Sequence, residues 1–187
     1  SYDGSTDEAE VVGKIFADQG VDPSKVSGDI EMVAYLQGYG DTTTDEINAA
    51  IQAAPDAFIS VGMATTFFTQ QLNAAGIEFS DIDSFTKSNG EAITSGKLVY
   101  LAGKYSSSVG PAFALIMNAI NGNIVRDADG NAVSISQNYQ VATDEATFDE
   151  FYKTDNGDNP IYNKETLDKI IGDSVTCDDI TKLVESK

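Results

Sequence analysis

The chain has 187 residues, of which 30 are acidic and 11 basic, and its formal net charge is −19. Because nucleic acids and anionic membranes bind proteins through clustered Lys and Arg, this charge argues against both as partners. The chain has no histidine, which excludes Ser-His-Asp and Cys-His catalysis and the usual zinc sites, and its single cysteine, Cys177, excludes an internal disulfide.

Helical and extended patterns alternate along the first two thirds of the chain. Apolar residues at helical spacing predict helices over 7–19, 44–54, 63–75 and 107–122, with a weaker helix over 88–94. Short apolar runs bounded by turn residues predict buried strands at 30–36, 57–61, 77–82 and 98–102. Strands separated by such helices pair in parallel. The expected fold class is therefore α/β, a Rossmann-like three-layer lobe around a central parallel sheet of about four strands.

After Asn123 the pattern changes. An Asp-Gly turn between residues 124–126 and 132–135 predicts a β-hairpin, and residues 136–142 predict a further extended stretch. The acidic remainder predicts short helices near 145–153, 164–171 and 177–185. We therefore expect an α/β domain over residues 1–123 and a hairpin and helical tail over residues 124–187.

Ligands of open α/β sheets bind beyond the carboxyl ends of the strands, so the loops at that edge hold the candidate site. The candidate ligand-binding residues in these loops are Tyr39, Asp41, Thr43, Met63, Thr65, Asp83, Lys104 and Tyr105. The carboxylate of Asp83 can accept hydrogen bonds from two neighbouring hydroxyls. Tyr39 can stack on a sugar face, and Lys104 can donate to a hydroxyl or a carboxylate.

Several candidates have a structural alternative. Asp83 can cap the helix that follows it, and Thr65 or Thr66 can cap the helix after the second predicted strand. The loop of Tyr39, Asp41 and Thr43 can be a glycine-eased turn, and Lys104 can be an exposed cation. Residues 106–108 can either cap a helix or bind an anion through backbone N–H groups.

Residues 127–131, Asp-Ala-Asp-Gly-Asn, have the beginning of a calcium-loop pattern. The bidentate Glu of such a loop does not follow at the required distance, so a turn is favoured. We assign no catalytic residue, no metal ligand and no cofactor, and we expect that the chain is not an enzyme.

Three segments have a recognisable order of elements. Residues 30–61 combine a strand, a polar loop, a helix, Ala-Pro-Asp and a strand; residues 72–83 contain Leu-Asn-Ala-Ala-Gly-Ile and then Asp-Ile-Asp; residues 95–122 contain Gly-Lys-Leu, a strand, a glycine-led helix and Asn-Gly. This order resembles the C-terminal lobe of type I periplasmic-binding-protein-like sugar receptors. Residues 144–152 resemble C-terminal segments of surface lipoproteins in the same family.

The resemblance implies a sugar-binding component of an ABC importer, present here as a single lobe without the N-terminal lobe. It implies a small polar solute such as a sugar, an ABC permease as the partner of the full-length protein, and an extracytoplasmic cell-surface lipoprotein. Residues 124–187 would cross back toward the missing lobe. The exposed face between the lobes is expected to favour self-association.

Two other functions stay open. A small flavodoxin-like or Rossmann-like enzyme would need an acid/base pair, which Asp41 and Asp83 could form if their loops meet; Gly38 and Gly40 lack the third glycine of a dinucleotide fingerprint. The effector-binding core of a transcription regulator shares this kind of lobe, but the sequence has no helix-turn-helix or basic region.

Overall fold

The computed structural model describes residues 33, 34, 36 and 44–187. The chain divides into two units, the first ending at Asp56 and the second beginning at Ala57. In the first unit, α2 (Thr44–Gln52) confirms the helix predicted over 44–54. The predicted helix over 7–19 and most of the predicted strand over 30–36 lie outside the described residues.

The second unit contains a four-stranded sheet in the order β1-β2-β3-β4. The strands β1 (Ala57–Ile59), β2 (Glu78–Ser84) and β3 (Leu98–Lys104) pair in parallel, and β4 (Gln140–Ala142) pairs antiparallel to β3. Three predicted strands are thus confirmed, whereas the sheet takes its fourth strand from the tail. The fold is α/β, with an open, mostly parallel sheet flanked by helices, consistent with the predicted Rossmann-like lobe.

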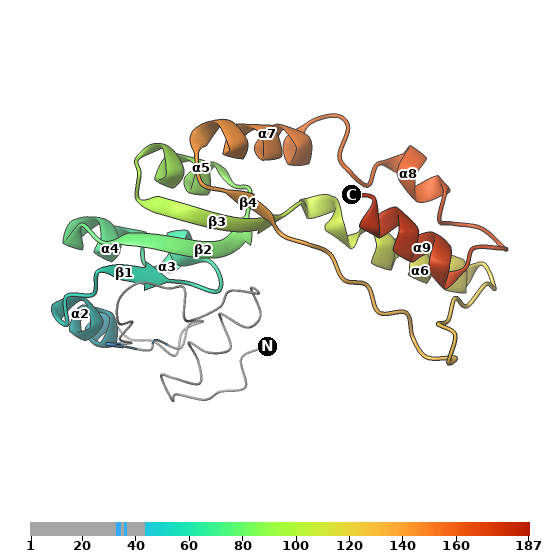
Figure 1. The fold of residues 1–187 in the computed structure, drawn as a ribbon, viewed down its shortest axis with the longest axis horizontal. Helices are drawn as coiled ribbons and strands as arrows, with labels where there is room; N and C mark the ends of the chain where they lie inside the picture. The colour runs from blue at the N-terminus through green and yellow to red at the C-terminus, as the bar shows by residue number, and fades with distance from the viewer. Residues whose placement is uncertain (1–32, 35, 37–43) are drawn as a thin grey trace, which may run out of the picture. The chain divides into compact units, whose positions relative to one another are not determined.

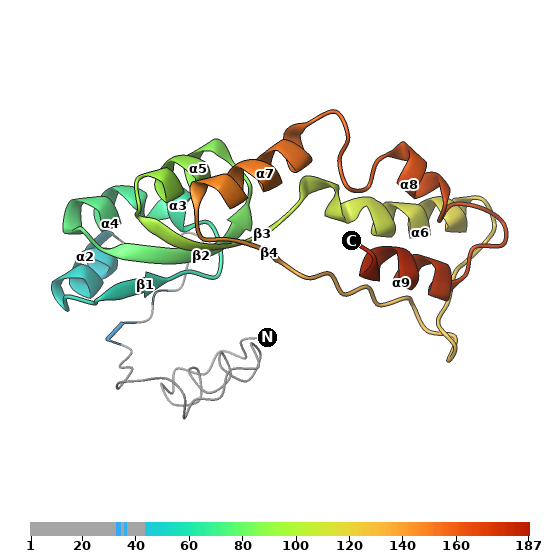
Figure 2. The same cartoon turned by 45° about the horizontal axis from the view of Figure 1, so that its top comes forward.

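Four helices accompany the sheet. The helices α3 (Ala64–Phe67) and α4 (Thr69–Ala75) connect β1 to β2, α5 (Lys87–Thr94) connects β2 to β3, and α7 (Glu145–Asn156) follows β4. α4 contacts β2, α5 contacts β3, and α7 contacts both β4 and α5. Figures 1 and 2 show α4, α5 and α7 along the same side of the sheet.

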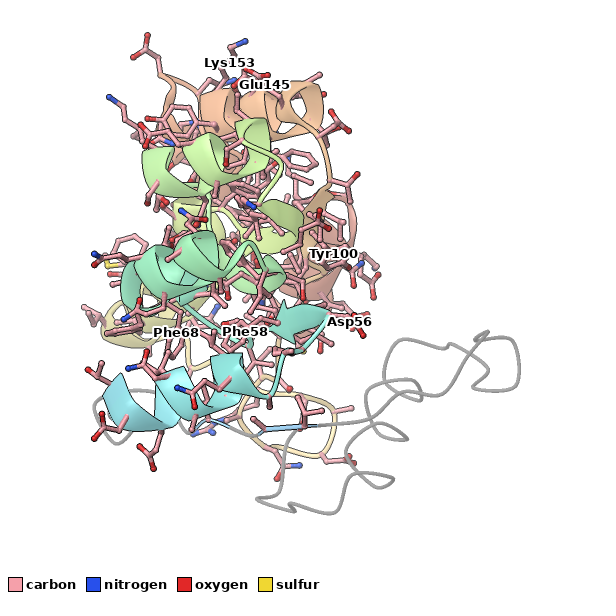
Figure 3. The ribbon with its side chains drawn as sticks, turned by 90° about the vertical axis from the view of Figure 1, so that its left-hand side faces the viewer. Asp56, Phe58, Phe68, Tyr100, Glu145 and Lys153 are labelled. Carbon is pink, nitrogen blue, oxygen red and sulfur yellow. The ribbon has the colours of Figure 1, made fainter. Side chains whose placement is uncertain are left out.

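The core lies between this helical layer and the sheet, because alternate strand residues point to the same face. Phe79, Leu98 and Leu101 are buried. Phe58 of β1 meets Phe68, at the start of α4, with ring centroids 5.3 Å apart (Figure 3). On the other face of the sheet, the apolar side chains of Ile59, Tyr100 and Val141 are exposed. The helices of the second unit therefore bury one face of the sheet.

Glycines allow aromatic rings to approach this layer closely. Phe85 is buried. The centroid of its ring lies 5.3 Å from the ring centroid of Phe151 and 6.0 Å from that of Phe148, both in α7. A Cβ atom at Gly103 of β3 would lie 2.5 Å from the Phe85 ring, and one at Gly90 of α5 would lie 2.6 Å from the Phe148 ring. Only a residue without a side chain fits at either position.

A second hydrophobic cluster forms after β3. The chain continues through the 3₁₀ helix η2 (Ser106–Val109) into α6 (Gly110–Ile120), which packs with α8 (Lys164–Asp168) and α9 (Cys177–Glu185), as Figure 1 shows. Its buried residues are Ala114, Ile170, Ile180 and Val184. The buried Asn118 joins two of these elements: its amide donates to the Ile170 carbonyl at 2.9 Å, and its oxygen accepts from the Gly172 N–H at 2.8 Å.

The tail therefore contributes to both hydrophobic clusters of the second unit. Its elements β4 and α7 pack at the sheet, and α8 and α9 pack against α6. Its predicted helices are confirmed as α7, α8 and α9, although α8 ends at Asp168 and is shorter than predicted. The predicted hairpin consists of a single bridge between Arg126 and Ala132 around the expected turn, in which Gly130 has φ 81°.

Replacing Gly103 with alanine is expected to lower the free energy of unfolding by about 1–3 kcal/mol, because the added methyl group overpacks the Phe85 ring. The matched control is Gly172→Ala, where the nearest atom, in Val175, is 3.8 Å away; it should stay within about 0.5 kcal/mol of the parent. Urea unfolding of the three proteins measures the difference. Equal effects of both substitutions would contradict this packing.

Candidate functional site

Asp83 lies at the carboxyl end of β2, where its carboxylate is held by three donors. Its Oδ1 accepts from the Ser84 N–H at 2.7 Å and the Ser84 hydroxyl at 3.2 Å, and its Oδ2 accepts from the Asn89 amide at 3.0 Å. The N-cap of α5 is Thr86, whose hydroxyl accepts from the Asn89 N–H. The alternative that Asp83 caps this helix is therefore wrong, and its half-buried carboxylate remains at the ligand edge.

Asn89 is the residue that brings this edge together. It is 0% exposed, and its amide nitrogen donates to the Asp83 carboxylate and to the Ser84 carbonyl, the latter at 2.7 Å. Its amide oxygen accepts from the hydroxyl of Thr65, which lies in α3 after β1. The structure therefore joins two of the predicted site residues, Thr65 and Asp83, through a side chain that the sequence analysis did not single out.

A second carboxylate, Asp81, lies beneath the loop between β1 and α3. It is 1% exposed, and its Oδ2 accepts from the Ala64 N–H at 2.6 Å while its Oδ1 accepts from the Ile82 N–H at 2.9 Å. Burial raises the pKa of Asp81 above its ordinary value, against the lowering effect of a hydrogen bond from Ser60. Asp81 thus holds the start of α3 from the neighbouring strand.

The predicted caps of α3 are consequently wrong. The N-cap position is Met63, which has left-handed backbone geometry and makes no side-chain cap hydrogen bond. The first free N–H of the helix is satisfied by Asp81, so neither Thr65 nor Thr66 needs to cap. Met63 and Thr65 both lie at the carboxyl end of β1, as predicted.

Lys104 and Tyr105 follow β3 but face different surroundings. The Lys104 side chain is exposed, and its ammonium lies 4.9 Å from the centroid of the Tyr139 ring. Because Asp83 pairs with Gly103, strand alternation places Lys104 on the opposite face of the sheet. The ring centroid of Tyr105 lies 5.5 Å from that of Phe85. Burial raises the pKa of the Tyr105 hydroxyl, and the negative charges of Glu150 and Asp155 raise it further. The structure therefore does not bring either residue to Asp83.

The serines at the start of η2 do not form an anion site. The Asp155 carboxylate of α7 accepts from the Ser106 N–H at 2.5 Å and from the Ser106 hydroxyl at 2.9 Å. A carboxylate of the chain itself thus occupies the place that an anion would take, and it also replaces the capping role predicted for Ser107 or Ser108.

The acidic turn at residues 127–131 is a turn, as expected. The Asp127 carboxylate accepts from the backbone N–H groups of Asp129 and Asn131 at 3.0 and 2.7 Å. Within the part of the chain that the structure describes, no group of three or more His, Cys, Asp or Glu side chains is placed to hold a metal ion. The predicted residues Tyr39, Asp41 and Thr43 lie outside the described residues.

Sequence reasoning missed Asp81 and Asn89, although each left a signal. Asp81 is two residues before Asp83 within a strand, so both carboxylates point to the buried face of the sheet. Asn89 lies three residues after Thr86, in the first turn of the short helix α5. A polar side chain on the sheet-facing side of a short helix needs partners, which here are the strand ends.

Comparison of the chain with models of protein families, with curated proteins and with solved structures finds no match. Among residues 33, 34, 36 and 44–187, no helix has the length and apolar character needed to cross a membrane.

Replacing Asn89 with alanine is expected to lower the free energy of unfolding by about 1–3 kcal/mol, because it removes the amide partner of the Thr65 hydroxyl and of the Asp83 Oδ2. The control is Glu91→Ala on the same helix, which removes an exposed side chain and should change stability by at most about 0.5 kcal/mol. Chemical denaturation measures both. A loss no larger than that of the control would show that the network is not a stabilising one.

Proposed function

We propose that this chain is one lobe of a solute-binding protein that takes a small polar solute, with a sugar as the best candidate. In the full-length protein, the solute would be passed to an ABC permease. The observation that supports this most directly is Asp83, a carboxylate held by three hydrogen bonds at the carboxyl end of β2. The extracytoplasmic, lipoprotein location that belongs to this proposal rests on the resemblance alone.

The network at this edge favours a hydroxylated ligand. A carboxylate has about four acceptor sites, of which Ser84 and Asn89 use three. The Thr65 hydroxyl donates to Asn89, so its oxygen remains available to accept a hydrogen bond. Asp83 and Thr65 thus offer two fixed acceptors from neighbouring loops, an arrangement suited to donors such as adjacent sugar hydroxyls.

An exposed apolar face of η2 and α6 supports an additional lobe. Four apolar residues lie on one helix face, because they are spaced four, three and four residues apart: Val109 at the end of η2, and Phe113, Ile116 and Ile120 of α6. All four side chains are exposed, with exposed fractions of 69%, 49%, 60% and 71% in that order. No charged residue occurs between Lys104 and Arg126. We call these four residues the α6 stripe. An uncharged helix face with four exposed apolar side chains is typical of an interaction surface. In this proposal, its partner is the second lobe that a closing receptor requires.

In this proposal the ligand is enclosed by hinge closure. It stabilises the closed state by its greater affinity for that state, so an isolated lobe makes only part of the contacts. The chain by itself is therefore expected to bind weakly.

A stabilising sugar should be found by thermal shift with a panel of pentoses and hexoses at concentrations up to tens of millimolar. The stabilisation arises because the ligand binds the folded state alone, and it should be lost in Asp83→Asn, which removes the charge but keeps the shape. Asp129→Asn, at the exposed acidic turn, is the matched control and should keep the shift. A shift that persists in Asp83→Asn would contradict a site at this residue.

The uncovered α6 stripe should drive self-association of the isolated chain. Light scattering after size exclusion is expected to show a mass that rises with concentration, because association removes apolar surface from water. Ile116→Asp should shift the protein toward monomer, while Asn138→Asp, which adds the same charge at an exposed site outside the stripe, should not. A parent chain that stays monomeric at millimolar concentration would contradict this role of the stripe.

A further inference from the structure

The loop that joins β1 to α3 is held in a costly conformation. Met63 has φ 61° and ψ 30°, the left-handed region that non-glycine residues adopt at a cost of about 1 kcal/mol or more. Such a conformation persists only where the surroundings enforce it. The next residue, Ala64, is 0% exposed, so the enforcing contacts must come from inside the protein.

The enforcing contact is a charged hydrogen bond from the adjacent strand. The Asp81 carboxylate, 1% exposed, accepts from the Ala64 N–H at 2.6 Å, and Ser60 donates a side-chain hydrogen bond to the same carboxylate. The Ser60 hydroxyl oxygen in turn accepts from the Gly62 N–H at 3.1 Å. One buried carboxylate therefore fixes both ends of the segment that carries Met63.

We infer that Asp81 is the positioning residue of the ligand edge: by holding residues 60–64 it places Thr65 where it meets Asn89 and, through Asn89, Asp83. The inference rests on the proposed function, since it assigns Asp81 to the same site without giving it contact with the solute. It goes beyond that function by naming the group that keeps the site in its binding geometry before a ligand arrives.

The charges around Asp81 are few. Asp83, on the same strand, is the charged group that acts on it, and it raises the pKa of Asp81 further. β1 and α3 carry no ionisable side chain, while Lys87 and Glu91 of α5 and Lys104 of β3 are exposed. The protonation of Asp81 is therefore governed by its burial, its hydrogen bonds and the one neighbouring carboxylate.

Positioning by a buried carboxylate has a distinctive pH signature. Because the folded-state pKa of Asp81 lies above its ordinary value, the folded protein takes up the proton first as the pH falls, and the cost of burying the charge is relieved. At the same time the charge-assisted bond to the Ala64 N–H weakens. The loop should thus loosen locally while the contribution of Asp81 to global stability improves.

The experiment follows the backbone amide of Ala64 by NMR in the chain without ligand, from pH 8 down to the pH at which folded signals disappear. In the parent chain, the Ala64 amide proton should move upfield, with a midpoint at higher pH than that of an ordinary aspartate because the pKa of Asp81 is raised by burial. In Asp81→Asn this titration should vanish. Hydrogen exchange at Ala64 should be at least about tenfold faster in Asp81→Ala than in the parent at the same pH.

Two further variants leave Asp81 in place and keep the test valid if its own variants fold poorly. Asp83→Asn removes the repelling charge and should lower the midpoint, whereas Ser60→Ala removes a hydrogen bond to the ionised form and should raise it. An Ala64 amide that does not titrate, or that titrates unchanged in these variants, overturns the inference. If Ala64 titrates as expected but no sugar perturbs Met63, Thr65 or Asp83, the positioning stands and the proposed function fails.

Discussion

The candidate site depends on one buried side chain, Asn89. Its amide has no contact with solvent, and its oxygen and nitrogen are bonded to Thr65, Asp83 and the Ser84 carbonyl. Because an amide offers both a donor and an acceptor, it can join a hydroxyl to a carboxylate, which no apolar or charged residue of that size can do. Two segments of the chain, one around Thr65 and one from Asp83 to Asn89, thereby meet at the carboxyl edge of the sheet.

The two carboxylates of β2 share a strand face but have different roles, because their depths differ. Asp81 is buried and accepts hydrogen bonds from the backbone N–H groups of Ala64 and Ile82, so its role is structural. Asp83, two residues later, is only half-buried at the end of the strand. The α6 stripe is a second distinctive feature. The chain has 30 acidic residues, yet this exposed helix face carries no charge. The second unit therefore has a polar edge at the ends of β1 and β2 and a separate apolar helix face.

The sequence predicts the order of the elements better than their partners. The alternating pattern located β1, β2, β3 and the helices between them, because apolar periodicity is a local property. It did not reveal that residues 140–142 complete the sheet, since pairing between distant segments is set by packing. For the same reason it placed Asp83 and Thr65 at the ligand edge but missed Asn89 and Asp81. Tyr105 does not lie beside Asp83, because its ring packs against Phe85 and against Phe151 of α7.

The central claim is that the carboxyl edge of β1 and β2 receives a hydroxylated solute. It is tested most directly by titrating the ¹⁵N-labelled chain with the sugar panel and mapping the shifted amides, since NMR detects the weak binding expected of one lobe. The account predicts saturable shifts that concentrate at Met63, Thr65, Ser84 and Asn89 and that disappear in Asp83→Asn. Shifts that cluster on another surface, or none with any sugar at tens of millimolar concentration, would contradict it.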